Sequence, residues 1–359
     1  MIPVNQPFLP PKSAYIEMID EVWDRSWLTN NGPNLRLLEE NIQKFLGLNN
    51  KPVVVNNGTI ALQIAIKSLE LKGEIITTPF SYVATASSIV WENCKPVFAD
   101  IDPETFNIAP SSIEKLISKN TTAILGTHVF GNPCNISEID GLAKKNQLKV
   151  IYDAAHAFAV DYNNQSVFEY GDISTTSLHA TKLYHSVEGG FIASPHSELT
   201  RTFELMRNFG HDGPYKFSSL GINGKNSELH AAMGLINLQF LDKILAKRKE
   251  LVETYENGLA DLPISFQRWN DKATRNYSYM PILFESEDQL VATEKHLESK
   301  EIFTRRYFYP TLDHLPYLKE DDQLVTAKSV ASCIMCLPLY YDLEISNAEK
   351  VIEVIRDSF

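Results

Sequence analysis

Cysteine is scarce in this sequence, and long apolar segments are absent. Four cysteines in 359 residues are too few and too widely spaced for a disulfide framework. Cys333-x-x-Cys336 lies in the apolar segment ASCIMCLPLY without a second pair, which favours buried cysteines over a redox or metal site. No apolar run is long enough to span a bilayer, and the N-terminus has no signal-peptide pattern. These absences predict a cytoplasmic protein that does not enter a membrane.

Positive charge is also in short supply. The formal net charge is -12, from 33 lysines and arginines against 45 aspartates and glutamates. Without a basic stripe or tail, a protein that wraps nucleic acid is excluded. The sequence has no Gly-x-Gly-x-x-Gly after its first predicted strand, no phosphate-binding loop, no Gly-x-Ser-x-Gly and no His-Glu-x-x-His. These gaps argue against the common nucleotide-binding, serine hydrolase and metallopeptidase sites, and we expect no metal.

From Val53 onward, short β-branched runs alternate with amphipathic helical runs. The predicted strands are 52–56, 74–78, 96–100, 122–127 and 148–153, and the predicted helices between them are 59–70, 81–93, 110–118 and 136–146. Alternation at this spacing indicates βαβ units, and therefore a mostly parallel sheet with helices on both faces.

Beyond residue 153 the pattern becomes more mixed. The sequence predicts a hairpin around Asn163-Asn164, further strands on both sides of Lys182, one long helical stretch over 227–258, and strands at 276–284 and near 302–307. We therefore predict an α/β protein with two domains. Residues 1–240 would form a large domain with an N-terminal arm, and residues 241–359 a small C-terminal α/β domain.

Four local features follow predicted strands, at the edge where open α/β sheets bind ligands. Gly58-Thr59 begins a helix whose N–H groups could receive a phosphate, although plain capping is commoner. Tyr82 could stack on a planar ligand or simply pack. Asp153 ends an apolar strand and needs a cation, donors or a cap. Lys182 lies in SLHATKLYHSVEGG, near a strand-to-loop junction, although most lysines are only surface charges.

Pyridoxal phosphate chemistry needs these four features together. A lysine amine binds the cofactor aldehyde and moves a proton, and a carboxylate keeps the pyridine nitrogen protonated. An aromatic side chain covers the ring, and backbone donors at a helix start hold the phosphate. The features also occur in a consistent order along the chain. The combination predicts a pyridoxal 5'-phosphate enzyme with Lys182 as its catalytic residue.

Six segments carry a family resemblance over nearly the whole chain. The segments NNGTIALQIAI, TTPFSYVAT, KPVFADIDPETFNI, THVFGNP, YDAAHAF and SLHATKLYHSVEGG resemble the DegT/DnrJ/EryC1/StrS family of sugar aminotransferases. The resemblance implies the fold type I of pyridoxal-phosphate transferases. It also implies transfer of an amino group from L-glutamate to a nucleotide-linked keto sugar, in a homodimer with shared active sites.

The resemblance also assigns roles to individual residues. Lys182 matches the lysine that binds the cofactor, and Asp153 matches the partner of the pyridine nitrogen. The remaining matches are expected to contact the ring or the phosphate, Asn223 from the neighbouring subunit: Gly58, Thr59, Tyr82, His156, Ser177 and Asn223.

Two departures from the family pattern stand out. Leu178 replaces a frequent Phe, which is a small packing change, and Asn223-Gly224-Lys225 stands where Asn-Tyr-Arg is common, which puts any contact of that arginine in doubt. Relatives that became sugar dehydratases carry His in place of Lys182, so the lysine favours transamination.

Segments such as HATKLYHSVEGG and RNFGHDG are most similar to enzymes that aminate dTDP-4-keto-6-deoxyglucose at C4, in deoxyamino sugar biosynthesis for lipopolysaccharide O-antigen. A 3-aminotransferase acting on a dTDP-3-keto-6-deoxysugar and a non-catalytic pyridoxal-phosphate-binding regulator stay open as alternatives. Three residues are candidates for nucleotide or sugar contact, with packing or solvated roles equally open: Arg306, Tyr309 and His314.

Overall fold

A mixed sheet of seven strands forms the centre of the computed structural model, which describes all residues from 1 to 359. The strand order is β1-β9-β8-β5-β4-β2-β3, and only β9 runs antiparallel to its neighbours. This arrangement confirms the predicted α/β class and the mostly parallel sheet. The strands are β1 (Val53–Val55), β2 (Glu74–Thr77), β3 (Lys95–Phe98), β4 (Thr121–Thr127), β5 (Lys149–Asp153), β8 (Ile173–Ser177) and β9 (Gly190–Ala193).

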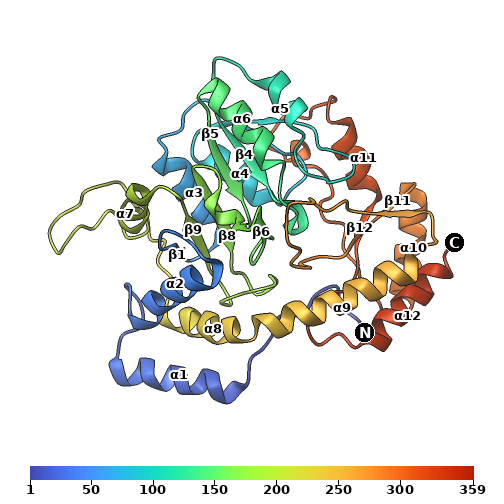
Figure 1. Cartoon of the computed structure of the whole chain (residues 1–359), viewed down its shortest axis with the longest axis horizontal. Coiled ribbons are helices and arrows are strands. Elements are labelled where there is room, and N and C mark those ends of the chain that lie inside the picture. The colour runs from blue at the N-terminus through green and yellow to red at the C-terminus, as the bar shows by residue number, and fades with distance from the viewer.

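Helices cover both faces of this sheet (Figure 1). Side chains alternate along β5, so Ile151 packs with α3, α4 and α7 on one face, while Val150 and Tyr152 pack with α5 and α6 on the other. Burial on both faces explains why the strands are apolar almost throughout. The helices are α3 (Gly58–Ser68), α4 (Val83–Trp91), α5 (Pro110–Leu116), α6 (Ile136–Asn146) and α7 (Ser197–Met206).

The predicted hairpin at Asn163-Asn164 is confirmed. It joins β6 (Asp161–Tyr162) to β7 (Gln165–Ser166), and the two asparagines have φ of 50° and 62°. Positive φ at both central residues is typical of a type I′ turn, in which asparagine is favoured. Short 3-10 helices at η1 (Val129–Gly131) and η2 (Val167–Glu169) follow β4 and β7.

The predicted long helix is two helices. α8 (Glu228–Gln239) and α9 (Leu241–Leu259) are separated by Phe240, whose φ of -102° and ψ of 0° interrupt the helical path. α8 packs against α1 (Lys12–Arg25) and α2 (Pro33–Leu46). α9 then leads toward the C-terminal elements (Figure 1). None of the helices combines the length and the apolar character that a membrane crossing needs.

A second, antiparallel sheet lies in the C-terminal part, in the order β10-β11-β12. The prediction of a strand over 276–284 is correct only for Pro281–Phe284, and the predicted strand near 302–307 is wrong. That segment makes only isolated bridges, because Phe308 turns into an aromatic cluster with Phe80 and Phe130 instead of continuing a ladder. The elements are β10 (Ile264–Phe266), β11 (Pro281–Phe284), β12 (Ile334–Cys336), α10 (Glu287–Ser299), η3 (Leu312–His314), α11 (Val325–Cys333) and α12 (Ile345–Arg356).

The two cysteines of the Cys-x-x-Cys segment are both free. Cys336 is buried in β12, and Cys333 is half-buried at the end of α11. The apolar surroundings of Cys336 raise the pKa of its thiol, which disfavours the reactive thiolate.

The hydrophobic cores give a physical basis for dividing the chain. The largest core runs from Phe8 to Ile244, and another joins Ile2 to residues between Leu251 and Ile355. The first turns of α9 therefore pack on the large sheet's core and its later turns on the small one. We propose a domain boundary at residues 240 and 241, where α9 begins, with the first turns of this helix packing back on the large domain.

Candidate active site

The loop between β8 and β9 carries Lys182 and is held by its own backbone. The N–H groups of Leu178 and Ala180 donate to the carbonyls of Gly189 and Val187, at 2.8 and 2.7 Å. These bonds continue the antiparallel pairing of β8 and β9 past the strand ends. The loop therefore presents Lys182 beside the carboxyl end of β8.

Two glycines allow the strands around this loop to approach the start of α3. A Cβ atom on Gly190 would lie 2.6 Å from the carbonyl oxygen of Thr176 and 2.8 Å from that of Asn57. One on Gly58 would lie 2.9 Å from the Cβ of Ser177. The predicted phosphate residues Gly58 and Ser177 are therefore in contact, although they lie far apart in the sequence.

Replacing Gly190 by alanine is expected to lower the free energy of unfolding by about 1–3 kcal/mol, because the surrounding atoms belong to the backbone and cannot easily move aside. The matched control is Gly141→Ala on α6, where an added methyl group meets nothing within 4 Å. Alanine there is expected to raise stability by about 0.5–1 kcal/mol. Denaturant unfolding of both variants measures the difference, and equal stabilities would contradict the close approach at Gly190.

Asp153 ends β5 and is buried. Its Oδ2 accepts a hydrogen bond from the Thr85 hydroxyl at 2.9 Å, and its Oδ1 accepts one from the N–H of Ala155 at 3.1 Å. Burial raises the pKa of Asp153, while these two donors and the charge of Lys182 act to lower it. Thr85 escaped the sequence prediction, although it lies within the TTPFSYVAT segment.

The amine of Lys182 is enclosed by protein, although part of the side chain reaches the surface. Burial lowers the pKa of Lys182 to about 8, against the opposing influence of Asp153 and Tyr82. Lys182 and the three predicted ring contacts Asp153, His156 and Tyr82 thus lie close enough to interact electrostatically. The neutral, nucleophilic form of the amine is therefore more populated near neutral pH than that of an ordinary lysine.

His156 packs among aromatic side chains. Its Nδ1 accepts a hydrogen bond from the N–H of Phe130 at 3.2 Å, and its ring centroid is 4.7 Å from that of Tyr279. Burial and the charge of Lys182 lower the pKa of His156 well below its usual range, so the ring is neutral. Since Nδ1 accepts, the proton is assigned to Nε2, which leaves a donor for a ligand.

The C-terminal half of the chain helps to fix this histidine. The carbonyl of His156 accepts hydrogen bonds from Asn276 Nδ2 and Ser278 Oγ, both at 2.8 Å. Neither residue was predicted from the sequence, because nothing local connects them with residue 156.

The start of α3 offers backbone donors. Asn57, which the sequence prediction passed over, caps the helix by accepting the N–H of Ile60 at 2.8 Å. The N–H groups of Gly58 and Thr59 belong to the first turn and have no partner within the helix. Capping by Asn57 therefore leaves these two N–H groups available for an anion.

The remaining predicted residues lie at the surface. Tyr82 stands just before α4 and is 57% exposed, so its ring is accessible. Asn223 is exposed beside its own chain's β1: its carbonyl accepts from Asn56 Nδ2 at 3.4 Å, and its Oδ1 accepts from Lys225 at 2.7 Å. Its role toward a neighbouring subunit stays a prediction.

The three candidates for substrate contact differ in availability. Arg306 donates to Glu287 at 2.6 Å and to the carbonyl of Ser332 at 2.7 Å, and its guanidinium lies over the ring of Tyr309. His314 lies 3.1 Å from Glu320. These contacts favour a packing role for Arg306.

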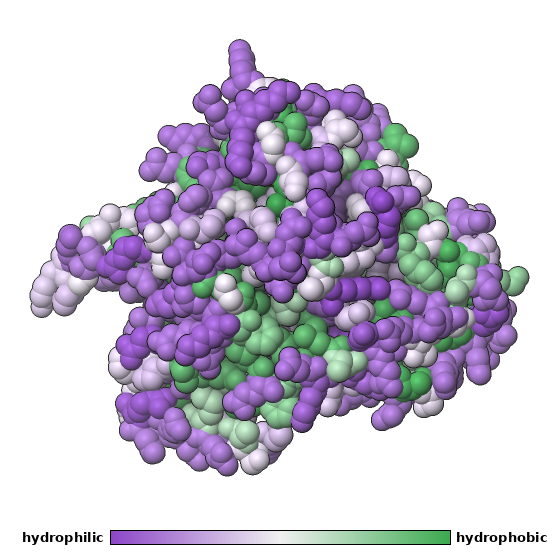
Figure 2. Space-filling view, viewed as in Figure 1, coloured by the Kyte–Doolittle hydropathy of each residue, from purple (hydrophilic) through white to green (hydrophobic).

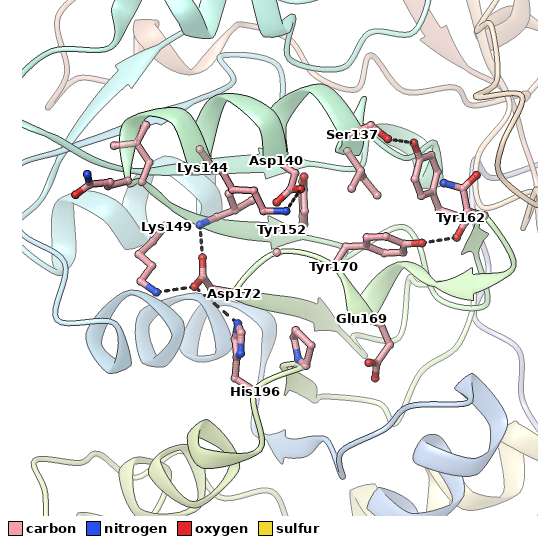
Figure 3. A pocket seen from close by; sticks show the side chains of 18 residues that line it. Ser137, Asp140, Lys144, Lys149, Tyr152, Tyr162, Glu169, Tyr170, Asp172 and His196 are labelled. Carbon is pink, nitrogen blue, oxygen red and sulfur yellow. Dashed lines mark hydrogen bonds and ion pairs between the residues drawn. The ribbon is translucent and has the colours of Figure 1, made fainter.

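A cavity of about 580 Å³ between α6 and the sheet contains none of the predicted site residues (Figure 3). Its lysines are already paired, Lys144 with Asp140 at 2.6 Å and Lys149 with Asp172 at 2.7 Å (Figure 3). The predicted site residues therefore lie outside this cavity.

The groups around Lys182 fit pyridoxal phosphate. They comprise an amine with a lowered pKa, a buried carboxylate, a neutral imidazole with a free donor, and backbone donors beside a serine hydroxyl. Together they match an aldehyde, a pyridine nitrogen, a ring oxygen and a phosphate.

Comparison with known proteins agrees with this reading. The model of the DegT/DnrJ/EryC1/StrS aminotransferase family matches residues 12–356. A dTDP-4-amino-4,6-dideoxy-D-glucose transaminase of Shigella dysenteriae is 41% identical over 360 residues, covering 99% of this chain and 98% of that protein. A transaminase of the same name from Escherichia coli is 37% identical over 365 residues, covering 99% and 97%.

Solved structures show the same fold. DesI, crystallised in the presence of its TDP-sugar product, superposes with a TM-score of 0.93 at 28% identity, over 99% of this chain and 92% of that one. PseC of Helicobacter pylori, an aminotransferase involved in the biosynthesis of pseudoaminic acid, gives 0.90 at 26% identity, over 100% and 99%.

Proposed function

Because the chain belongs to the DegT/DnrJ/EryC1/StrS aminotransferase family, we propose that this sugar aminotransferase uses pyridoxal 5'-phosphate to move the amino group of L-glutamate to C4 of dTDP-4-keto-6-deoxyglucose. The product would enter deoxyamino sugar biosynthesis, including that of lipopolysaccharide O-antigen. The full-length similarity to two transaminases of this specificity supports the choice of substrate.

The observation that carries the proposal is that His156 and Lys182 line one small pocket, with the buried Asp153 close enough to Lys182 to interact with it electrostatically. Bound pyridoxal phosphate would supply a ring that accepts the electrons released when a proton leaves the amino-bearing carbon. Asp153 would hold the pyridine nitrogen in its protonated form. His156 would donate a hydrogen bond from its Nε2–H to the ring oxygen.

The phosphate and the ring face need separate contacts. The N–H groups of Gly58 and Thr59 and the hydroxyl of Ser177 would bind the phosphate, in line with the preference of helix starts for anions. Tyr82, which is exposed at the start of α4, would cover the ring.

Lys182 would move the protons. In its neutral form the amine would accept a proton from the α-carbon of glutamate and pass it to the cofactor carbon that carries the amino group. In the second half-reaction it would take a proton back from that carbon and deliver it to C4 of the sugar. A pKa of about 8 lets the amine act in both directions near neutral pH, since a catalytic acid or base works best when its pKa is close to the working pH.

We also infer a homodimer. The segment after α7 extends away from the body of the molecule (Figure 1) and exposes Phe209, Tyr215, Phe217 and Leu220. Trp23 is also exposed, on α1. Figure 2 shows that the visible face is mostly hydrophilic, with apolar areas near α8 and near β11 and α10. A second copy covering such side chains would bring Asn223 near the partner's phosphate site.

A substrate panel tests the reaction. With L-glutamate as donor, we expect turnover of dTDP-4-keto-6-deoxyglucose and a product that NMR shows to carry the amine at C4. Amination at C3 of a dTDP-3-keto-6-deoxysugar would establish the alternative specificity. A protein that binds pyridoxal phosphate but fails even the half-reaction with glutamate would be a non-catalytic regulator.

A further inference from the structure

β1 forms one edge of the large sheet and pairs only with β9. An edge strand leaves the backbone groups of alternate residues without a strand partner. Along β1 these groups are met by other parts of the chain. The N–H of Val54 donates to Glu39 at 3.0 Å, the carbonyl of Val54 accepts from Arg207 at 2.7 Å, and the N–H of Asn56 donates to the carbonyl of Gly224 at 2.9 Å.

Arg207 contributes to this edge with both its side chain and its backbone. It follows α7 and is 4% exposed. Its Nη1 donates to Glu39 as well as to Val54, and its own carbonyl accepts the N–H of Gly224 at 2.9 Å. Arg207 therefore fixes Val54 directly and fixes Asn56 through Gly224.

The segment around Gly224 fits closely against its neighbours. A Cβ atom on Gly224 would lie 3.1 Å from Ile60 and 3.4 Å from the Cα of Arg207. Asn226 donates to the carbonyls of Val55 and Glu188, at 3.4 and 3.2 Å. The segment thus joins the end of β1, the first turn of α3 and the Lys182 loop.

The pair of Arg207 with Glu39 is buried, because Glu39 is 0% exposed. Lys51 lies 3.3 Å from the second oxygen of Glu39. Removing two charges from water costs free energy that their attraction often only balances, so a buried ion pair is a weak source of stability. The pair of Arg207 with Glu39 acts here through geometry, because it fixes the path of the chain at the end of β1.

We propose that Arg207 is a positioning residue for the phosphate of the cofactor. It holds Val54 in β1 and, through Gly224, Asn56, which lies two residues before Gly58. Gly224 is also the residue after Asn223. This inference rests on the proposed function, because it concerns the phosphate site of the same reaction. Without Arg207, both predicted phosphate-binding segments lose a common anchor.

The test compares two ligands that differ only in the phosphate. Arg207→Met is made in the full chain, and dissociation constants for pyridoxal 5'-phosphate and for pyridoxal are measured by spectroscopic titration. We expect the constant for pyridoxal phosphate to rise by about tenfold or more, as for other residues that orient binding groups, while that for pyridoxal stays unchanged. Arg207→Lys should restore part of the affinity.

The matched control is Arg201→Met. Arg201 lies on α7, the helix that Arg207 follows, but it is 58% exposed and pairs with Glu204 and Asp212 at the surface. This variant should bind both ligands like the wild type. If the wild type itself takes up no pyridoxal phosphate, the proposed function fails, whereas a selective failure of the inference leaves wild-type binding intact.

Arg207→Met leaves Glu39 buried beside one fewer cation, which by itself destabilises the fold. The double variant Glu39→Gln with Arg207→Met removes both charges and keeps the test decisive. Thermal unfolding establishes which variants fold. Three results would overturn the inference. A folded variant could bind pyridoxal phosphate with wild-type affinity, a folded variant could lose equal affinity for both ligands, or both variants could fail to fold.

Discussion

Replacing Lys182 by alanine is expected to lower kcat by about 10⁴-fold or more, since one side chain both binds the cofactor and transfers the proton. The absorbance band at roughly 400–430 nm, typical of a pyridoxal phosphate Schiff base with lysine, should disappear as well. Absorbance spectra and turnover with glutamate measure the two effects independently.

Lys145→Ala provides the control for this change. Lys145 lies on α6 at the surface, where it pairs with Glu114 at 3.1 Å, and such exposed pairs contribute little. The control should keep both the band and the activity. A Lys182→Ala protein that retained the band would show that another amine binds the cofactor.

Asp153→Asn is expected to lower kcat by about 10²- to 10³-fold, because the neutral amide cannot balance a protonated pyridine nitrogen. The effect on stability should have the opposite sign. Burial raises the pKa of Asp153 in the folded protein. Asp153 therefore contributes to stability at pH values below its pKa in the unfolded chain, and this contribution is lost as the pH rises through its pKa in the folded protein. At neutral pH the buried carboxylate therefore lowers the free energy of unfolding of the cofactor-free protein.

Denaturant unfolding at pH 7 without cofactor should show Asp153→Asn to be at least as stable as the wild type. Asp140→Asn is the matched control, because Asp140 is exposed and pairs only with Lys144 at the surface. It should change neither activity nor stability appreciably. A less stable Asp153→Asn variant with full turnover would contradict both parts of the argument.

The regular elements of the large sheet could be read from the sequence because their signals are local. The helix predicted at 136–146 is the observed α6, whose start is set by the capping residue Asn135. The strand predicted at 148–153 begins one residue later, at Lys149. Apolar runs and caps of this kind do not depend on distant contacts.

Other features depend on tertiary contacts, and sequence patterns do not reveal them. Phe240 continues the apolar pattern of its neighbours, yet its backbone leaves the helix there. Asn276 and Ser278 reach His156 only because the chain returns from its C-terminal half. Asn57, by contrast, carries a local capping signal, because asparagine is a favoured residue at helix starts.

Residue types alone predicted only part of the candidate site. Asp153 and Lys182 followed from the need of a cofactor for a carboxylate and an amine at strand ends. Their partners did not, because Thr85 and Phe130 are ordinary residues whose importance lies in where their donors point. The individual roles of Ser177 and Asn223 came from the family resemblance alone and stay predictions.

The pairing of β1 with β9 alone affects the order in which the nascent chain can fold. Val53 pairs with Ile192, so β1 cannot join the sheet until the segment beyond Lys182 has left the ribosome. Closing so long a loop is slow and entropically costly, and until then the apolar residues of β1 lack their strand partner. We expect the sheet from β2 to β5 to consolidate first, and the capacity to take up cofactor to arise late in synthesis.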